Sequence, residues 1–120
     1  MLTPLAIDEL FGSARVLTEG GIAGDPERPT WYGSVLITFW LGGLAAEAEL
    51  DRVVEAITGS VRVRVLAHRL ARAQLEERFP DRDLGTAHLE SRFRRVGASL
   101  LLDIDLEAPI EVACSRRRAR

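Results

Sequence analysis

Residues 31–41 carry the most constraining pattern in this chain. The run WYGSVLITFWL is β-branched and aromatic, and it is almost wholly apolar at both odd and even positions. This composition predicts a strand with apolar side chains on both faces, so both faces need cover. Because side chains alternate along a strand, Trp31 and Phe39 fall on one face, and Tyr32 and Trp40 on the other. One helix cannot cover both, so we expect a subunit interface with these four aromatic residues as candidates.

The rest of the chain divides into short elements separated by Gly and Pro. Capping residues and apolar periodicity predict a helix over Leu2–Phe11, with Thr3 as N-cap and Pro4 in the first turn. A second helix is predicted over Leu44–Ile57, with Gly59 as its stop. Alternation and β-branched content predict further strands over residues 14–18, 61–65, 86–96, 98–106 and 110–113.

Two segments have less regular patterns. Glu19–Thr30 contains three Gly and two Pro and is predicted to be a loop, and Pro109 is expected to mark a turn or a sheet edge. Leu66–Phe79 fits either a helix or an extension of the preceding strand, and both remain open. The element order predicts an α+β domain over residues 1–115, with a mostly antiparallel sheet and one or two helices packed on one face. Residues 116–120 form a basic tail that we expect to be frayed.

The composition excludes several kinds of catalytic site. All 16 basic residues are Arg, so neither a Schiff-base lysine nor a P-loop lysine is present. Cys114 is the only Cys, which excludes a disulfide or a Cys-based zinc site within one chain. His68 and His88 lack the spacing of paired metal ligands. We therefore expect no catalytic residue, no cofactor and no metal. We also expect neither a secretory signal nor a membrane span.

Two charged groups have alternative interpretations. Asp103 and Asp105 lie two residues apart on one strand face and could bind a divalent cation together with His88, but a solvated outer face is the simpler interpretation. Arg92 and Arg94 could belong to a basic face that contacts phosphate or an acidic protein. Ordinary solvated strand faces are again the simpler interpretation.

Three runs of residues resemble the centre of one known family. VLITFWLGG is followed at once by LAAEAELDRVVEAI. The later run HRLARAQLEERFPDRDLGTAHLESRFRRV passes through an acidic turn into a strand that closes with Arg92-Phe93-Arg94. Over about residues 31–96 the chain is similar to phage tail-terminator, or tail-completion, proteins. The resemblance implies that part of Leu66–Phe79 is a strand.

The resemblance also implies a function. It implies a non-enzymatic structural protein of a phage or phage-like particle, such as a gene transfer agent or a prophage. Six copies would form a ring that terminates the tail tube and joins it to the head connector, with DNA passing through the ring without specific binding. The implied partners are other copies of the chain, tail-tube proteins and head-connector proteins, with no membrane. The implied location is the virion or particle, after assembly in the bacterial cytoplasm. Ring contacts would use the exposed face of residues 31–41 and the loop over residues 19–30, with Arg92 and Arg94 as further interface candidates.

Two other functions compete with this one. Glu27-Arg28-Pro29 before a strand and Ala108-Pro109-Ile110 late in the chain resemble segments of small pterin-type enzymes of the tunnelling fold, dihydroneopterin aldolase in particular. The Lys that this resemblance requires shortly before the late motif is replaced by Leu106-Glu107. The third function is a generic adaptor that binds another protein through an edge strand. The ring and the adaptor predict self-association, whereas the enzyme requires a polar pocket that holds Glu27 near an interface.

Overall fold

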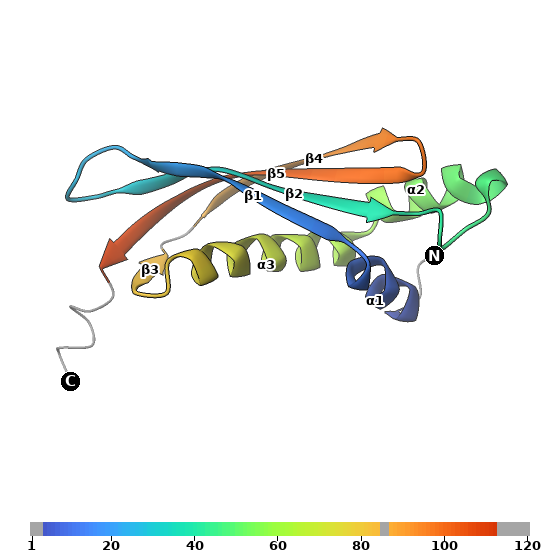
Figure 1. The fold of residues 1–120 in the computed structure, drawn as a ribbon, viewed down its shortest axis with the longest axis horizontal. Coiled ribbons are helices and arrows are strands. Elements are labelled where there is room, and N and C mark those ends of the chain that lie inside the picture. Colours follow the sequence, from blue (N-terminus) through green and yellow to red (C-terminus); the bar gives the residue numbers. More distant parts are fainter. Residues whose placement is uncertain (1–3, 85–86, 113–120) are drawn as a thin grey trace.

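Two long strands at the centre of a sheet organise the fold (Figure 1). The structure is a computed structural model that describes residues 4–84 and 87–112. The strands in this part of the chain are β1 (Arg15–Ala23), β2 (Thr30–Trp40), β3 (Arg82–Leu84), β4 (His88–Val96) and β5 (Ser99–Val112). Neighbouring strands are antiparallel in the order β1-β2-β5-β4, and β3 pairs with the last residues of β5. The predicted α+β class with a mostly antiparallel sheet is confirmed.

Helices cover one face of this sheet. The helical elements are α1 (Pro4–Gly12), the short 3-10 turn η1 (Glu47–Glu49), α2 (Leu50–Thr58) and α3 (Val61–Arg78). Figure 1 shows α3 lying along the sheet, with α1 and α2 near one end of it. Among the described residues, no helix is long and apolar enough to cross a membrane.

The core lies between the sheet and the helices. β2 contributes odd-numbered side chains and β5 even-numbered ones, because alternate residues of a strand face the same side. α3 contributes buried residues spaced four apart: Val63, Ala67, Ala71 and Leu75. α1 adds Phe11, whose ring meets the ring of Phe39 edge-on with the centroids 5.2 Å apart. The sequence patterns of the strands and of α3 therefore converge on one apolar layer.

Small residues let α3 approach the sheet closely. Ala71 is fully buried on the sheet-facing side of the helix, whereas Ala73 of the same helix is exposed. We expect Ala71→Leu to lower the free energy of unfolding by about 1–3 kcal/mol, because the added carbons overpack the layer. Ala73→Leu is the matched control and should change stability by less than about 0.5 kcal/mol. Urea unfolding followed by circular dichroism measures both, and equal stabilities of the two variants would contradict this packing.

The molecule is longer than an ordinary domain of this size. Its principal extents are 57 × 28 × 19 Å and its radius of gyration is 16.8 Å. A compact domain of 120 residues has a radius of gyration of about 13.5 Å. Figure 1 shows the reason: the β1–β2 hairpin and the end of β5 extend past the end of α3. Part of the sheet therefore has no helix beneath it.

The predicted loop over Glu19–Thr30 is wrong in its first part. β1 continues through Ala23 and forms a hairpin with β2, so the strand predicted over residues 14–18 is too short. Gly20 lies opposite Gly33, and the buried indole of Trp31 packs across this pair. The ring supplies the apolar cover that two glycines lack, and so the strands continue through residues that normally interrupt them.

The predicted strand over Val61–Val65 is also wrong, because these residues begin α3. The Ser60 hydroxyl accepts a hydrogen bond from the Val63 N–H at 3.2 Å and caps the helix. The helix continues to Arg78, so the strand that the family resemblance implied within Leu66–Phe79 is not present either. The alternation covers only five residues, whereas apolar residues recur every fourth position along most of α3. The pattern that covers more of the chain determines the structure.

Other boundaries differ in smaller ways. The helix predicted over Leu44–Ile57 begins as η1 and becomes α-helical only at Leu50. β5 does not break at Pro109, which lies between the residues that pair with β4 and those that pair with β3. A proline is tolerated there because no neighbouring strand requires its missing N–H. Thr3, Cys114 and the basic tail over residues 116–120 lie outside the described residues.

Candidate interaction surface

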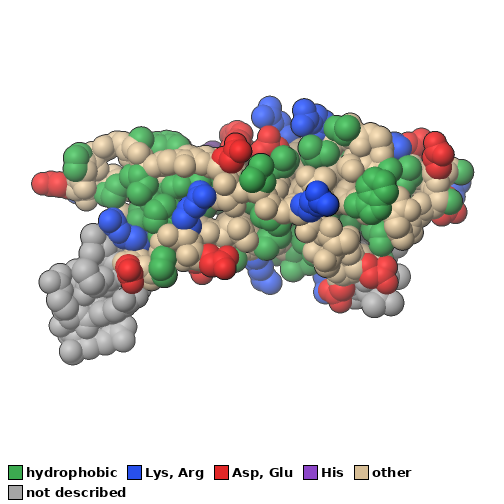
Figure 2. Space-filling view, in the orientation of Figure 1, with side chains coloured by type: hydrophobic (Ala, Val, Ile, Leu, Met, Phe, Trp, Pro, Cys, Tyr) green, Lys and Arg blue, Asp and Glu red, His purple; other side chains and the backbone are tan. Residues whose placement is uncertain are grey.

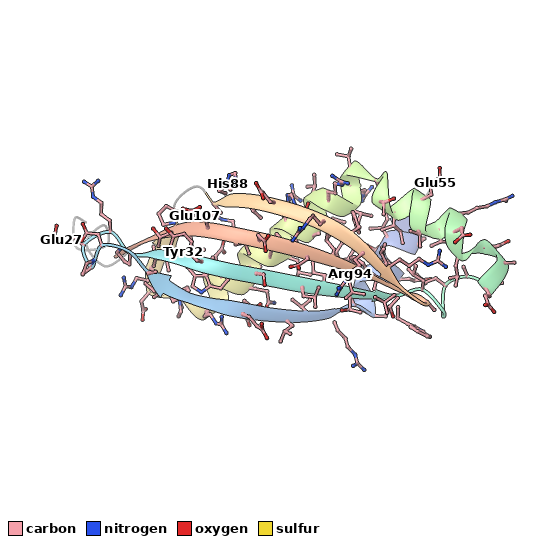
Figure 3. All side chains as sticks on the ribbon, turned by 90° about the horizontal axis from the view of Figure 1, so that it is seen from above. Glu27, Tyr32, Glu55, His88, Arg94 and Glu107 are labelled. Atoms are coloured by element: carbon pink, nitrogen blue, oxygen red, sulfur yellow. The ribbon has the colours of Figure 1, made fainter. Side chains whose placement is uncertain are left out.

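The face of the sheet opposite the helices is open. Figure 3, seen from above this face, shows Tyr32, His88, Arg94 and Glu107 on three neighbouring strands. The strand register arranges the side chains of this open face in rows that run from β1 to β4. Four of these rows are Arg15–Thr38–Leu101–Arg94, Leu17–Leu36–Asp103–Arg92, Glu19–Ser34–Asp105–Glu90 and Gly21–Tyr32–Glu107–His88.

The open face has two chemically different halves. The half nearer Trp40 combines arginines and one aspartate with aliphatic side chains: Arg15, Leu17, Leu36, Arg92, Arg94, Leu101 and Asp103. The half nearer the hairpin is mainly acidic: Glu19, Glu90, Asp105 and Glu107. Arg92 reaches between the halves, with its Nη2 4.0 Å from Asp105 Oδ2. Both side chains are largely exposed, so water screens this pair and leaves both groups able to contact a partner.

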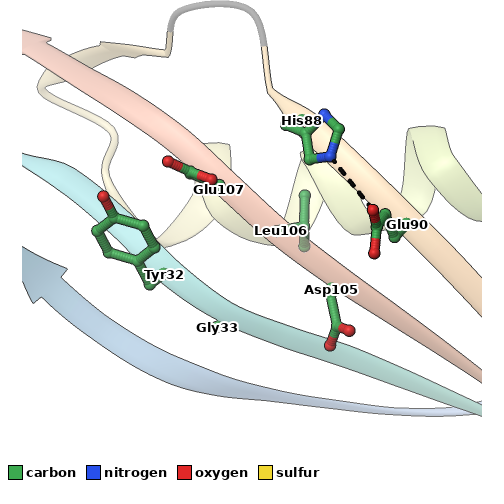
Figure 4. Close-up of a pocket in the computed structure, with 7 residues that line it drawn as sticks. All are labelled: Tyr32, Gly33, His88, Glu90, Asp105, Leu106 and Glu107. Atoms are coloured by element: carbon green, nitrogen blue, oxygen red, sulfur yellow. Dashed lines mark ion pairs between the residues drawn. The ribbon is translucent and has the colours of Figure 1, made fainter.

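The acidic half contains a shallow hollow of about 430 Å³ (Figure 4). Tyr32 lines one side and His88 the other, with Glu107 and Asp105 between them. His88 Nε2 lies 3.6 Å from Glu90 Oε1, and both side chains are mostly exposed. The hollow is therefore an open part of the sheet surface and does not exclude water in the way that a closed catalytic pocket does.

The carboxylates of β5 share a face with His88 in the described part of the chain, as the alternation predicts. No group of three or more potential metal ligands is present there. Arg92 lies opposite Asp103 in the β4–β5 ladder and close to Asp105, so a positive charge already occupies the space beside both carboxylates. The solvated outer face is the better interpretation of this pair.

The four aromatic interface candidates separate by face. Trp31 and Phe39 are buried against the helices, with Trp31 only 1% exposed, so they belong to the core and cannot contact another subunit. Tyr32 and Trp40 point to the open face and are 45% and 53% exposed. Arg92 and Arg94 are exposed on the same face. The structure therefore brings four of the six candidate interface residues to one surface.

His68 and His88 lie on opposite sides of the sheet. His68 belongs to α3 and its Nε2 lies 3.4 Å from the Ser91 hydroxyl of β4, beneath the sheet. His88 stands on the open face. The two imidazoles therefore cannot act on one ligand within a single chain.

No protein-family model, curated protein or solved structure matches this chain. Its fold and its surface chemistry are therefore the basis for any functional assignment.

The two segments that resemble pterin-type enzymes do meet in space. The Ile110 N–H donates to the Pro29 carbonyl at 3.0 Å, and Thr30 pairs with Pro109. Glu27, however, is exposed in the turn of the hairpin, where the Asp25 carboxylate accepts its backbone N–H at 2.9 Å. A turn residue on the surface does not form the polar pocket that this enzyme class requires within one chain.

Two features at the margins of the sheet were not predicted from the sequence. The first is the outer edge of β1, which is nine residues long because the strand continues through Gly20 and Gly21. The second is a stripe on α3 made of Val61, Arg64, Val65 and His68, spaced so that they share one side of the helix. Two members of this α3 stripe reach β4: His68 contacts Ser91, and the Arg64 guanidinium lies 5.5 Å from the centre of the Phe93 ring. Val61 and Val65 remain exposed beside them.

Proposed function

We propose that the protein is a structural subunit that self-associates into a ring, the kind of ring that ends a phage tail tube and joins it to a head connector. The observation that carries this proposal is the open face of the sheet. Its apolar members include Leu17, Tyr32 and Trp40, each about half exposed, although the core on the other face is already complete. Exposed aromatic and aliphatic side chains gathered on one surface are typical of an interface.

The shape of the molecule supports the same proposal. A flat body 19 Å thick and 57 Å long, with sheet edges on both sides, can be placed repeatedly around an axis. Interfaces made of two different surfaces generate rings when the rotation closes. The acidic and basic halves of the open face also give a partner protein complementary charges to align on.

Native mass spectrometry combined with negative-stain imaging tests the proposal. We expect a species of about 80 kDa, six times the 13.3 kDa chain, that images as a ring, alone or after addition of a tail-tube protein. Trp40→Arg should weaken the binding of an added tail-tube protein to this species, because a charge at an aromatic interface position is desolvated without a partner. Glu55→Arg, an exposed substitution on α2 away from the open face, is the control and should leave the binding unchanged.

Two outcomes would contradict a tail-terminating ring. A monomer at every concentration, with and without a tube protein, would exclude the ring. A tetramer or octamer with a central tunnel that binds a pterin saturably would favour the enzyme, whose two resembling segments meet at Pro29 and Ile110.

A further inference from the structure

We propose that the ring is closed by strand pairing, with the β1 edge of one copy added antiparallel to the β4 edge of the next copy. The sheets of neighbouring copies then form one continuous sheet with all open faces on the same side. This inference rests on the proposed self-association and names the surface through which it occurs.

Both edges are free and they match in length and direction. β1 and β4 are the outer strands of the sheet, and neither pairs with a further strand in the described part of the chain. Each has nine residues. Three antiparallel steps separate them, so β4 runs opposite to β1, and a copy placed beside the sheet presents its β1 antiparallel to β4.

The backbone groups at both edges point outward in a regular order. The Leu41 N–H donates to Ala98 O and the Ile110 N–H donates to Pro29 O, so odd-numbered residues of β2 bond to β5. Because bonding direction alternates along an antiparallel strand, even-numbered residues of β1 and odd-numbered residues of β4 direct their N–H and C=O groups to the outside. The outward residues are Val16, Thr18, Gly20 and Ile22 on β1, and Leu89, Ser91, Phe93 and Arg95 on β4.

The β1 edge lacks the usual protection against pairing. Edge strands are commonly blocked by a proline, by an inward-pointing charge or by brevity. β1 contains no proline, and its two charged side chains, Arg15 and Glu19, project to the open face. Figure 2, which looks at the β1 side of the molecule, shows hydrophobic side chains and backbone over much of this side, with charged groups scattered among them. An unblocked edge of nine residues is a template for another strand.

Aligning the two strands end to end gives a register in which opposite charges face each other and outward-bonding residues lie opposite outward-bonding residues. Arg15 then lies opposite Val96 and Ala23 opposite His88, and the middle residues Glu19 and Arg92 form a cross-strand pair of opposite charge. Thr18 falls opposite Phe93, and both are outward-bonding residues, as the ladder requires.

The alternative register without a stagger is unfavourable. If the rows of side chains on the open face continued straight into the next copy, Glu19 of one copy would lie opposite Glu90 of the other, and Arg15 opposite Arg94. Like charges directly opposite each other destabilise a strand pair. The end-to-end register is offset from these rows by two residues, and an offset of this kind is what a sheet requires to close on itself.

The helix-facing side of the junction is also suitable for a second copy. In the end-to-end register Ile22, about half exposed in the single chain, lies opposite Leu89. The α3 stripe runs along β4 on this side, and its members Val61 and Val65 are exposed. A second copy paired with β4 would cover these valines, which a single chain leaves in water.

The test blocks each edge separately. Thr18→Pro removes an outward N–H from β1 and leaves the β1–β2 ladder intact, and Ser91→Pro does the same on β4. Thr18→Val and Ser91→Ala are the matched controls, because they remove the contacts to Gln74 and His68 but keep the backbone N–H. We expect each proline variant to be monomeric by native mass spectrometry and each control to assemble as the original chain does.

Mixing the two proline variants tests the head-to-tail arrangement. The Thr18→Pro chain retains a usable β4 edge and the Ser91→Pro chain retains a usable β1 edge. An equimolar mixture should therefore contain a heterodimer of about 27 kDa, twice the chain mass, and nothing larger. A mixture that stays wholly monomeric, although both variants keep the circular dichroism spectrum of the original chain, would overturn the inference.

Charge reversal tests the register with variants that do not disturb the backbone. Glu19→Arg alone and Arg92→Glu alone should each weaken assembly about tenfold, and the two together should restore it to within about threefold. Glu27→Arg, outside both strands, is the control and should have no effect. No restoration in the double variant would exclude this register.

The outcomes separate the inference from the proposed function. If the original chain forms rings and the proline variants form the same rings, strand pairing is wrong and the ring proposal stands. If the original chain is monomeric under all conditions, both are wrong.

Discussion

Replacing Trp31 by alanine is expected to lower the free energy of unfolding by about 3–5 kcal/mol, a large part of the roughly 5–15 kcal/mol that stabilises an ordinary domain. Trp31 is the largest of the fully buried side chains, and its ring also covers the glycine pair of the hairpin. Its loss therefore removes core packing and exposes the backbone of β1 and β2 together. Denaturant unfolding followed by tryptophan fluorescence, with Trp40 as the remaining reporter, measures the change.

Trp40→Ala is the matched control for this prediction. Trp40 lies on the same strand but on the open face, and about half of its side chain is exposed. We expect its removal to lower the free energy of unfolding by less than about 1.5 kcal/mol. Equal losses from the two tryptophans would mean that the open face is buried in the folded chain and would contradict the two-face description.

The second large effect is expected at Gly33. A Cβ atom at this position would overlap both the Trp31 ring and the backbone carbonyl oxygen of Glu19. Neither neighbour is the free end of a flexible side chain, so Gly33→Ala should force the hairpin apart and lower the free energy of unfolding by about 2–3 kcal/mol. Thermal unfolding should show a correspondingly lower midpoint.

Gly21→Ala, on the adjacent strand, serves as the comparison for Gly33→Ala. Nothing lies within 4 Å of a Cβ atom at Gly21. We expect this substitution to be neutral or slightly stabilising, because alanine restricts the unfolded chain more than glycine does. A Gly33→Ala variant as stable as Gly21→Ala would show that the indole does not pack over the glycine pair.

The sequence predicted those parts of the fold in which one pattern was long and uncontested. The apolar run over residues 31–41 predicted β2 and the correct separation of Trp31 from Trp40, since a period of two allows only one division into faces. The alternation of β5 likewise predicted its buried face. The strand prediction for residues 61–65 was wrong because a short alternation of valine and arginine also fits the first turns of a helix. The apolar repeat that identifies the helix lies further along α3.

Other features depend on contacts between distant residues and were not predictable from local patterns. Gly20 and Gly21 look like a loop until the Trp31 ring is placed over the hairpin. The sequence predicted part of the candidate surface, because alternation along the strands determines which face carries Tyr32, Trp40, Arg92 and Arg94. It did not predict the free edges, because they depend on the order of strands in the sheet.

The position of β5 in the sheet has a consequence for biosynthesis. β5 is the last strand in the sequence, yet it lies between β2 and β4 and joins them. Until the ribosome has released residues beyond Ser99, the apolar side chains of β2 have no partner strand on one side, and β4 has none at all. The sheet therefore completes only after β5 has been translated, through contacts between β2 and β5 that are far apart in the sequence. Such folding is slow, and it leaves aggregation-prone strands exposed while it lasts. Any chain truncated before β5 should aggregate instead of forming a smaller domain.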